Sequence, residues 1–103
     1  MAIIKKYSKN KKICRVTFKL SKGLCKSFKK ISLVGDFNDW NVDQNKFIEK
    51  NVDGSSSIEL MLKGNAEYQF KYFCDDHVWL NEPEADTYVA AAFKDSENSV
   101  LLI

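Results

Sequence analysis

The sequence contains a single histidine, and its surroundings do not favour catalysis. Any mechanism that needs an imidazole base must use His77. This residue follows Asp75 and Asp76 in a predicted turn, where the sequence places no serine or cysteine for activation. Adjacent carboxyls at a strand end diverge, whereas glycoside hydrolysis needs two carboxyls about 5–9 Å apart across a substrate. We interpret these residues as a surface turn and predict no catalytic residue and no enzyme activity.

The polar segment from Asp36 to Asp43 contains side chains whose oxygen atoms could bind calcium. Their spacing, however, is not that of a calcium-binding loop. An EF-hand loop beginning at Asp36 requires an oxygen ligand at its fifth position and Glu at its twelfth, where the sequence has Trp40 and Phe47. Turn-forming side chains explain this segment more simply. The four glycines stand alone, so none belongs to a phosphate-binding loop. The sequence therefore predicts no metal and no cofactor.

The three cysteines, Cys14, Cys25 and Cys74, stand at unrelated spacings and form no CxxC pair. Cys14 and Cys74 fall at apolar positions of predicted strands, which favours buried, reduced thiols. The first residues contain no apolar stretch of signal-peptide length, and no segment approaches the roughly 18 apolar residues of a membrane span. We therefore expect a cytoplasmic protein without a membrane partner.

The formal net charge of +2 hides an asymmetry along the chain. Residues 1–30 carry eleven Lys or Arg and no acid, whereas residues 31–103 carry five Lys and all fourteen acids, a charge of −9. Residues 5–30 are thus a candidate for anion or nucleic-acid binding, and the alternative is a solvated basic face. Because the lysines are spread out with few aromatic residues between them, we favour the solvated face and do not expect nucleic acid as a partner.

Apolar and polar side chains alternate along most of the chain, which is the pattern of half-buried strands. In residues 66–74, Tyr68, Phe70 and Tyr72 share one predicted face and leave Lys71 on the other. A loop is predicted at residues 21–28. Strands are predicted at residues 14–20, 30–35, 46–50, 58–62, 66–74, 78–81, 88–92 and 99–103.

Seven or so short strands separated by turns predict an all-β, immunoglobulin-like antiparallel β-sandwich. A chain of 103 residues fits one such domain, which we place at residues 12–103. Residues 1–11 form a basic N-terminal arm, and the sequence leaves open whether this arm is ordered or frayed.

Four motifs in this order resemble a known family: VGDFNDWN at 34–41, YQFKY at 68–72, WLNEP at 79–83 and NSV at 98–100. Together they resemble the isoamylase-type early-set domains, also called family 48 carbohydrate-binding modules. Such domains occur in glycogen branching and debranching enzymes and in the β subunits of AMP-activated protein kinase. The resemblance covers roughly residues 12–103 and is greatest to stand-alone bacterial early-set proteins of about this size.

The resemblance implies an immunoglobulin-like fold and a carbohydrate site with an α-glucan, such as glycogen or a maltooligosaccharide, as partner. It implies that Trp40 and Trp79 stack on glucose rings, and that Lys71 and Asn98 hydrogen-bond sugar hydroxyls. The chemistry agrees, because the axial C–H groups of a pyranose suit the negative face of an indole. The step from Lys71 to Trp79 is eight residues, where the family often has seven. This extra residue leaves open which sheet face Trp79 joins.

Two functions of different classes follow from these patterns. The first is a non-catalytic α-glucan-binding module. The alternative is a protein-interaction or self-associating scaffold domain without a sugar site, which pairs with a glycogen-metabolism enzyme or forms a homodimer. A lone sandwich has open sheet edges, which suit such pairing.

Overall fold

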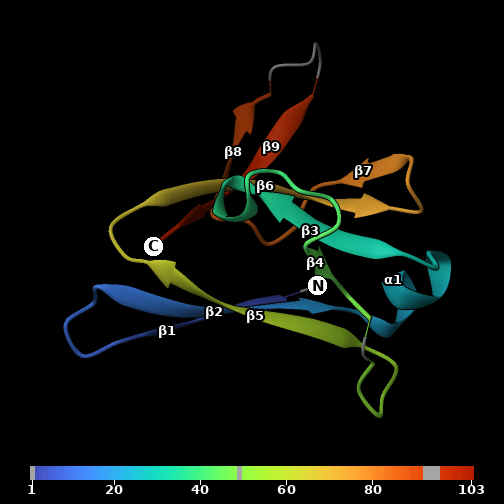
Figure 1. The fold of residues 1–103 in the computed structure, drawn as a ribbon, viewed down its shortest axis with the longest axis horizontal. Coiled ribbons are helices and arrows are strands. Elements are labelled where there is room, and N and C mark those ends of the chain that lie inside the picture. The colour runs from blue at the N-terminus through green and yellow to red at the C-terminus, as the bar shows by residue number, and fades with distance from the viewer. Residues whose placement is uncertain (1, 49, 92–95) are drawn as a thin grey trace.

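The computed structural model describes residues 2–48, 50–91 and 96–103 and is an all-β sandwich of two antiparallel sheets (Figure 1). This architecture confirms the predicted all-β sandwich. The smaller sheet has the order β1-β2-β5, with β1 at Ala2–Tyr7, β2 at Ile13–Leu20 and β5 at Ser56–Lys63. The larger sheet has the order β4-β3-β6-β9-β8, with β7 also paired to β6. Its strands are β3 (Ile31–Gly35), β4 (Asn45–Lys46), β6 (Glu67–Cys74), β7 (Val78–Leu80), β8 (Thr87–Ala90) and β9 (Glu97–Leu102).

The core lies between the two sheets and is built from the alternation that the sequence shows. Strand β2 buries every second side chain, namely Cys14, Val16, Phe18 and Leu20. Strand β6 buries Phe70 and Tyr72 on the predicted face, and the ring of Phe70 meets that of Phe18 at 5.4 Å in an edge-to-face contact. Since Phe18 and Phe70 come from different sheets, this contact joins the two layers.

Residues 21–28, predicted as a loop, contain a short helix, α1, at Lys22–Ser27. Ser21 caps it, because its Oγ accepts a hydrogen bond of 3.2 Å from the backbone N–H of Leu24. Cys25 is buried and Leu24 packs against the core, so one side of this single turn contributes to the interior. Residues 21–23, Ser-Lys-Gly, are typical of a turn. The contacts of Leu24 and Cys25 with the core favour a helix instead.

The N-terminal residues also belong to the sandwich, since β1 pairs with β2 from Ala2 opposite Lys19 to Tyr7 opposite Cys14. Strand β1 was not predicted, and with it the described residues contain nine strands. Strand β4 is only two residues long, Asn45–Lys46, and overlaps the stretch predicted at 46–50 at Lys46 alone; residue 49 lies outside the described residues. Strand β8 ends at Ala90, and the last residue of the predicted strand, Ala92, also lies outside them.

All three cysteines are free and buried, as predicted for Cys14 and Cys74. Burial, with a smaller contribution from the charge of Asp75, raises the pKa of the Cys74 thiol to about 11. This thiol is therefore protonated and unreactive near neutral pH. In residues 2–48, 50–91 and 96–103, no helix has both the length and the apolar character that crossing a membrane requires.

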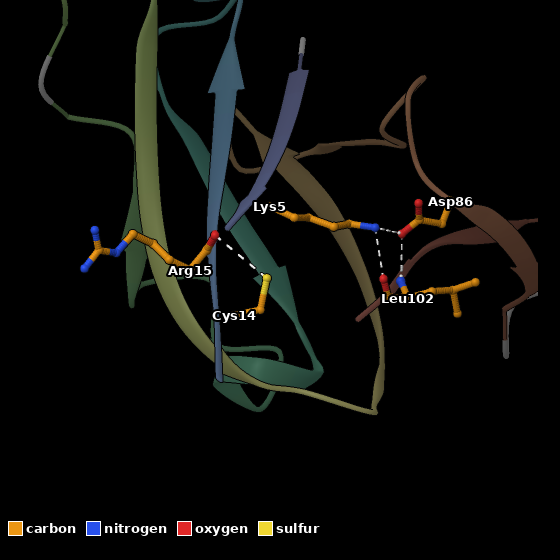
Figure 2. Close-up of polar contacts among 5 residues, drawn as sticks. All are labelled: Lys5, Cys14, Arg15, Asp86 and Leu102. Carbon is orange, nitrogen blue, oxygen red and sulfur yellow. Dashed lines mark hydrogen bonds and ion pairs between the residues drawn. The ribbon is translucent and has the colours of Figure 1, made fainter. Parts of the chain in front are cut away.

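Lys5 ties the edge strand of the smaller sheet to the larger sheet (Figure 2). Its Nζ donates hydrogen bonds to Asp86 Oδ2 at 2.6 Å and to the backbone oxygen of Leu102 at 2.9 Å. The same Asp86 oxygen accepts a bond of 2.8 Å from the backbone N–H of Leu102. Because Lys5 is only partly exposed, this contact is better shielded than an ordinary surface ion pair.

Replacing Lys5 by Met is expected to lower the free energy of unfolding by about 1 kcal/mol, since a partly shielded, charge-assisted contact is lost while the aliphatic stem remains. Lys6→Met is the matched control, because Lys6 is exposed on the opposite face of the same strand. Urea denaturation of both variants measures the difference. Equal stabilities of the two variants would show that the Lys5 contact contributes nothing.

Candidate functional site

Trp40 lies in a tight turn that follows β3 and the short 3-10 helix η1 at Asp36–Asn38. The buried side chain of Asn38 organises this turn: its Oδ1 accepts from the backbone N–H of Gly35 at 3.0 Å, and its Nδ2 donates to the oxygen of Leu33 at 2.9 Å. Asp39 and Trp40 both have left-handed backbones, with φ of 54° and 57°. The backbone N–H of Trp40 donates to the oxygen of Gly35 at 2.9 Å, which closes the turn.

The indole of Trp40 is held by a carboxylate from the same turn. Its Nε1–H donates to Asp36 Oδ1 at 2.9 Å, and the other oxygen of Asp36 accepts from the backbone N–H of Gln69 at 2.7 Å. Asp36 thus connects the ring to the neighbouring strand β6. These contacts support the interpretation of the polar segment as turn-forming.

Trp79 lies on β7, opposite Phe73 of β6 in the strand register. The two rings are 4.5 Å apart at an angle of 38°, and the Trp79 side chain is 45% exposed. Because side chains alternate along β6, Phe73 and Lys71 share the outer face, so Trp79 joins this face as well. The turn accommodates its extra residue with left-handed backbones at Asp75 and Asp76, with φ of 51° and 62°.

Lys71 and Asn98 come from the adjacent strands β6 and β9. Lys71 Nζ donates to the backbone oxygen of Glu97 at 2.7 Å, and Asn98 Nδ2 donates to Gln69 Oε1 at 3.0 Å. Both side chains are therefore fixed by neighbouring strands rather than free in solvent. The Asn98 carboxamide still has an oxygen that can accept a hydrogen bond.

All four side chains implied by the resemblance line one pocket of about 870 Å³, which we call the tryptophan pocket: Trp40, Lys71, Trp79 and Asn98. The pocket lies on the outer face of the larger sheet, away from the core. Four further lining residues were not predicted: Val42, Gln69, Ala91 and Ser96. The strand alternation contained a signal for Gln69, since it places this residue on the same face as Lys71.

The tryptophan pocket combines two indole rings with amide and ammonium groups. The rings offer flat apolar surfaces, and the polar groups offer hydrogen-bond donors and acceptors beside them. None of its lining residues within the described part of the chain carries a carboxylate. Such a pocket can pack a ligand against its rings and hydrogen-bond the polar groups of that ligand.

The remaining candidates form structural contacts. Asp75 Oδ1 accepts from the backbone N–H groups of Lys29 and Lys30, each at 2.9 Å, and Asp76 lies 3.5 Å from the Lys30 ammonium. His77 is exposed, and its Nδ1 lies 2.6 Å from the backbone oxygen of Asp75. Within residues 2–48, 50–91 and 96–103, no group of three His, Cys, Asp or Glu residues is placed to hold a metal ion.

Neither a scan against protein-family models nor a search of the curated proteins finds a match to this chain. What the tryptophan pocket binds is therefore inferred from its own side chains and their arrangement.

Proposed function

We propose that this protein is a non-catalytic α-glucan-binding module of the early-set type, which holds glycogen or maltooligosaccharide chains in the tryptophan pocket. The observation that carries the proposal is the convergence of Trp40, Lys71, Trp79 and Asn98 on one pocket from four separate segments of the chain. Each of the four residues belongs to a different one of the motifs that carry the resemblance. Their convergence is what a shared binding role requires.

In the proposed complex, the two indoles stack on glucose rings. Stacking suits Trp40 and Trp79 because an indole offers a wide, rigid apolar surface at little cost in conformational entropy. Trp79 is exposed and Trp40 is half-buried. The Lys71 ammonium has donors beyond the one that the Glu97 oxygen accepts, and Asn98 has a carboxamide oxygen. These groups orient the sugar through its hydroxyls.

The module binds a glucan without cleaving it. The lining residues that the structure describes lack the two opposed carboxyls of a glycosidase. The three free cysteines support a reducing compartment, and we propose the cytoplasm.

Replacing Trp40 by Ala is expected to weaken maltoheptaose binding at least about tenfold, because one stacking surface is lost. Calorimetric titration with the sugar at millimolar concentration measures this change. Tyr7→Ala is the control, since Tyr7 is an exposed aromatic residue on the smaller sheet and does not line the pocket. No binding by the unaltered protein, or equal binding by Trp40→Ala, would refute the proposal.

A scaffold domain is the second candidate, and the outer edge of β5 favours it. Among the described residues, no strand other than β2 pairs with β5, so β5 is an edge strand of the smaller sheet. A glycogen-metabolism enzyme or a second copy of the chain would then be the partner. Light scattering that shows a strict monomer, together with the absence of a partner in pull-down experiments, would exclude this role.

A further inference from the structure

We infer that Asp36 is a positioning residue of the tryptophan pocket, which fixes the Trp40 indole against strand β6 before any ligand binds. Its consequence for binding rests on the proposed glucan function, whereas the position of the indole is a property of the ligand-free protein. Asp36 itself does not line the pocket, but it contacts two residues that do, Trp40 and Gln69.

Both carboxylate oxygens of Asp36 are engaged, each by a different donor. Oδ1 accepts from Trp40 Nε1 at 2.9 Å, and Oδ2 accepts from the backbone N–H of Gln69 at 2.7 Å. The first contact spans four residues of the turn, and the second reaches a strand 33 residues away in sequence. A carboxylate is the short side chain that offers two acceptors in this way, and charge-assisted bonds of this kind are stronger than neutral ones.

The Trp40 turn is closed without this bridge. Asn38 already satisfies the backbone at Gly35 and Leu33, and the N–H of Trp40 donates to the Gly35 oxygen. The turn is thus closed by groups other than Asp36. What the Asp36 carboxylate adds is the orientation of the indole ring, which otherwise rotates about its side-chain bonds.

Two consequences for the ligand follow. The indole N–H is already bonded, so Trp40 offers a ligand its ring surface and no hydrogen bond. Gln69 connects the stacking surface to the polar end of the pocket, because its backbone N–H bonds Asp36 while its side-chain Oε1 accepts from Asn98. Hydroxyl recognition therefore belongs to the polar end of the pocket, where Asn98 and Lys71 lie. Holding these groups in place before binding avoids the entropy cost of ordering them in the complex.

The first test measures the indole N–H of Trp40 in the ligand-free protein by nuclear magnetic resonance, with Trp79→Phe used to assign its signal. Asp36→Asn is the variant, since an amide has one acceptor oxygen and cannot accept from both donors. We expect the Trp40 indole proton to shift and to exchange with water at least about fivefold faster, because its acceptor is weakened or lost. Asp39→Asn is the matched control: it removes the same charge from the same turn, and Asn tolerates the left-handed backbone at this position.

The second test measures binding of maltoheptaose. Asp36→Asn is expected to weaken it about fivefold, whereas Asp39→Asn leaves it unchanged. In a Trp40→Phe background, which lacks the indole N–H, Asp36→Asn is expected to have no further effect on affinity. A purely structural role of Asp36 would instead lower affinity equally in both backgrounds.

The outcomes separate this inference from the proposed function. If the unaltered protein binds no glucan, the proposed function fails and the indole measurement still tests Asp36. An indole signal that is the same in Asp36→Asn and the unaltered protein would overturn the inference. Unchanged sugar affinity in a folded Asp36→Asn variant would overturn it as well. Should Asp36→Asn fail to fold, fast exchange of the Trp40 indole proton in the unaltered protein, as for a free indole, would overturn it.

Discussion

Replacing Gly35 by Ala is expected to lower the free energy of unfolding by about 3 kcal/mol. A Cβ at this position would lie 2.5 Å from the backbone oxygen of Gln69 and 2.7 Å from the Cβ of Phe70. Both atoms belong to β6, which is fixed in the middle of the larger sheet, so neither can move aside at little cost. The strands β3 and β6 must therefore separate at the end of β3, where the Trp40 turn begins.

Gly23→Ala is the matched control, since a Cβ there meets nothing within 4 Å and Gly23 lies in helix α1. This change is expected to raise stability by about 0.5 kcal/mol, because alanine favours a helix over glycine. Thermal and urea denaturation of both variants measure the two effects. Similar stabilities of Gly35→Ala and the unaltered protein would contradict the close approach of β3 to β6.

Replacing Tyr72 by Phe is expected to lower the free energy of unfolding by about 2–3 kcal/mol. The Tyr72 hydroxyl donates to Glu82 Oε1 at 2.9 Å, and both side chains are fully buried. Burial, and then the charge of Glu82, raises the pKa of Tyr72, so its hydroxyl stays protonated and remains a donor. The phenylalanine variant keeps the ring and leaves a buried carboxyl oxygen without its donor.

Tyr7→Phe is the control, because this exposed hydroxyl lies on the smaller sheet, and its removal is expected to change stability by less than about 0.5 kcal/mol. Urea denaturation distinguishes the two variants. An equally small effect of Tyr72→Phe would mean that another donor replaces the hydroxyl at Glu82.

A series of hydrogen bonds connects the buried Tyr72–Glu82 pair to the tryptophan pocket. The Glu82 backbone N–H donates to Ser99 Oγ, which donates to Asn81 Oδ1. Asn81 Nδ2 and Lys71 Nζ then both donate to the backbone oxygen of Glu97, at 3.0 and 2.7 Å. Hydrogen bonds therefore run from the interior of the larger sheet to the cation of the pocket.

The alternation of side chains was sufficient to predict the strands that form the core. In β6 it assigned Phe70 and Tyr72 to the interior and Lys71 to the outer face, because a strand exposes its two faces in turn. Local propensity gave the wrong prediction, a loop, for residues 21–28, where tertiary contacts decide the structure. The start of α1 has the composition of a turn, and its helix is stabilised by burying Cys25, which no local pattern shows.

The sequence predicted four of the eight described residues that line the tryptophan pocket, but not their arrangement. The sequence left the face of Trp79 open, because the outcome depends on left-handed backbones at Asp75 and Asp76 and on two backbone N–H groups that bond Asp75. The contact from Asp36 to the N–H of Gln69 joins residues 33 positions apart. Such pairings arise from the packing of β3 against β6 and leave no periodic signal in the sequence.

We propose that the tryptophan pocket binds an α-glucan through Trp40, and a calorimetric titration measures this binding. Maltoheptaose is titrated into the unaltered protein and into Trp40→Ala, with Tyr7→Ala as the control for loss of an exposed aromatic ring. We expect saturable binding to the unaltered protein and to Tyr7→Ala, and at least about tenfold weaker binding to Trp40→Ala. Absence of binding to the unaltered protein at millimolar sugar, or the same affinity in Trp40→Ala, would contradict it.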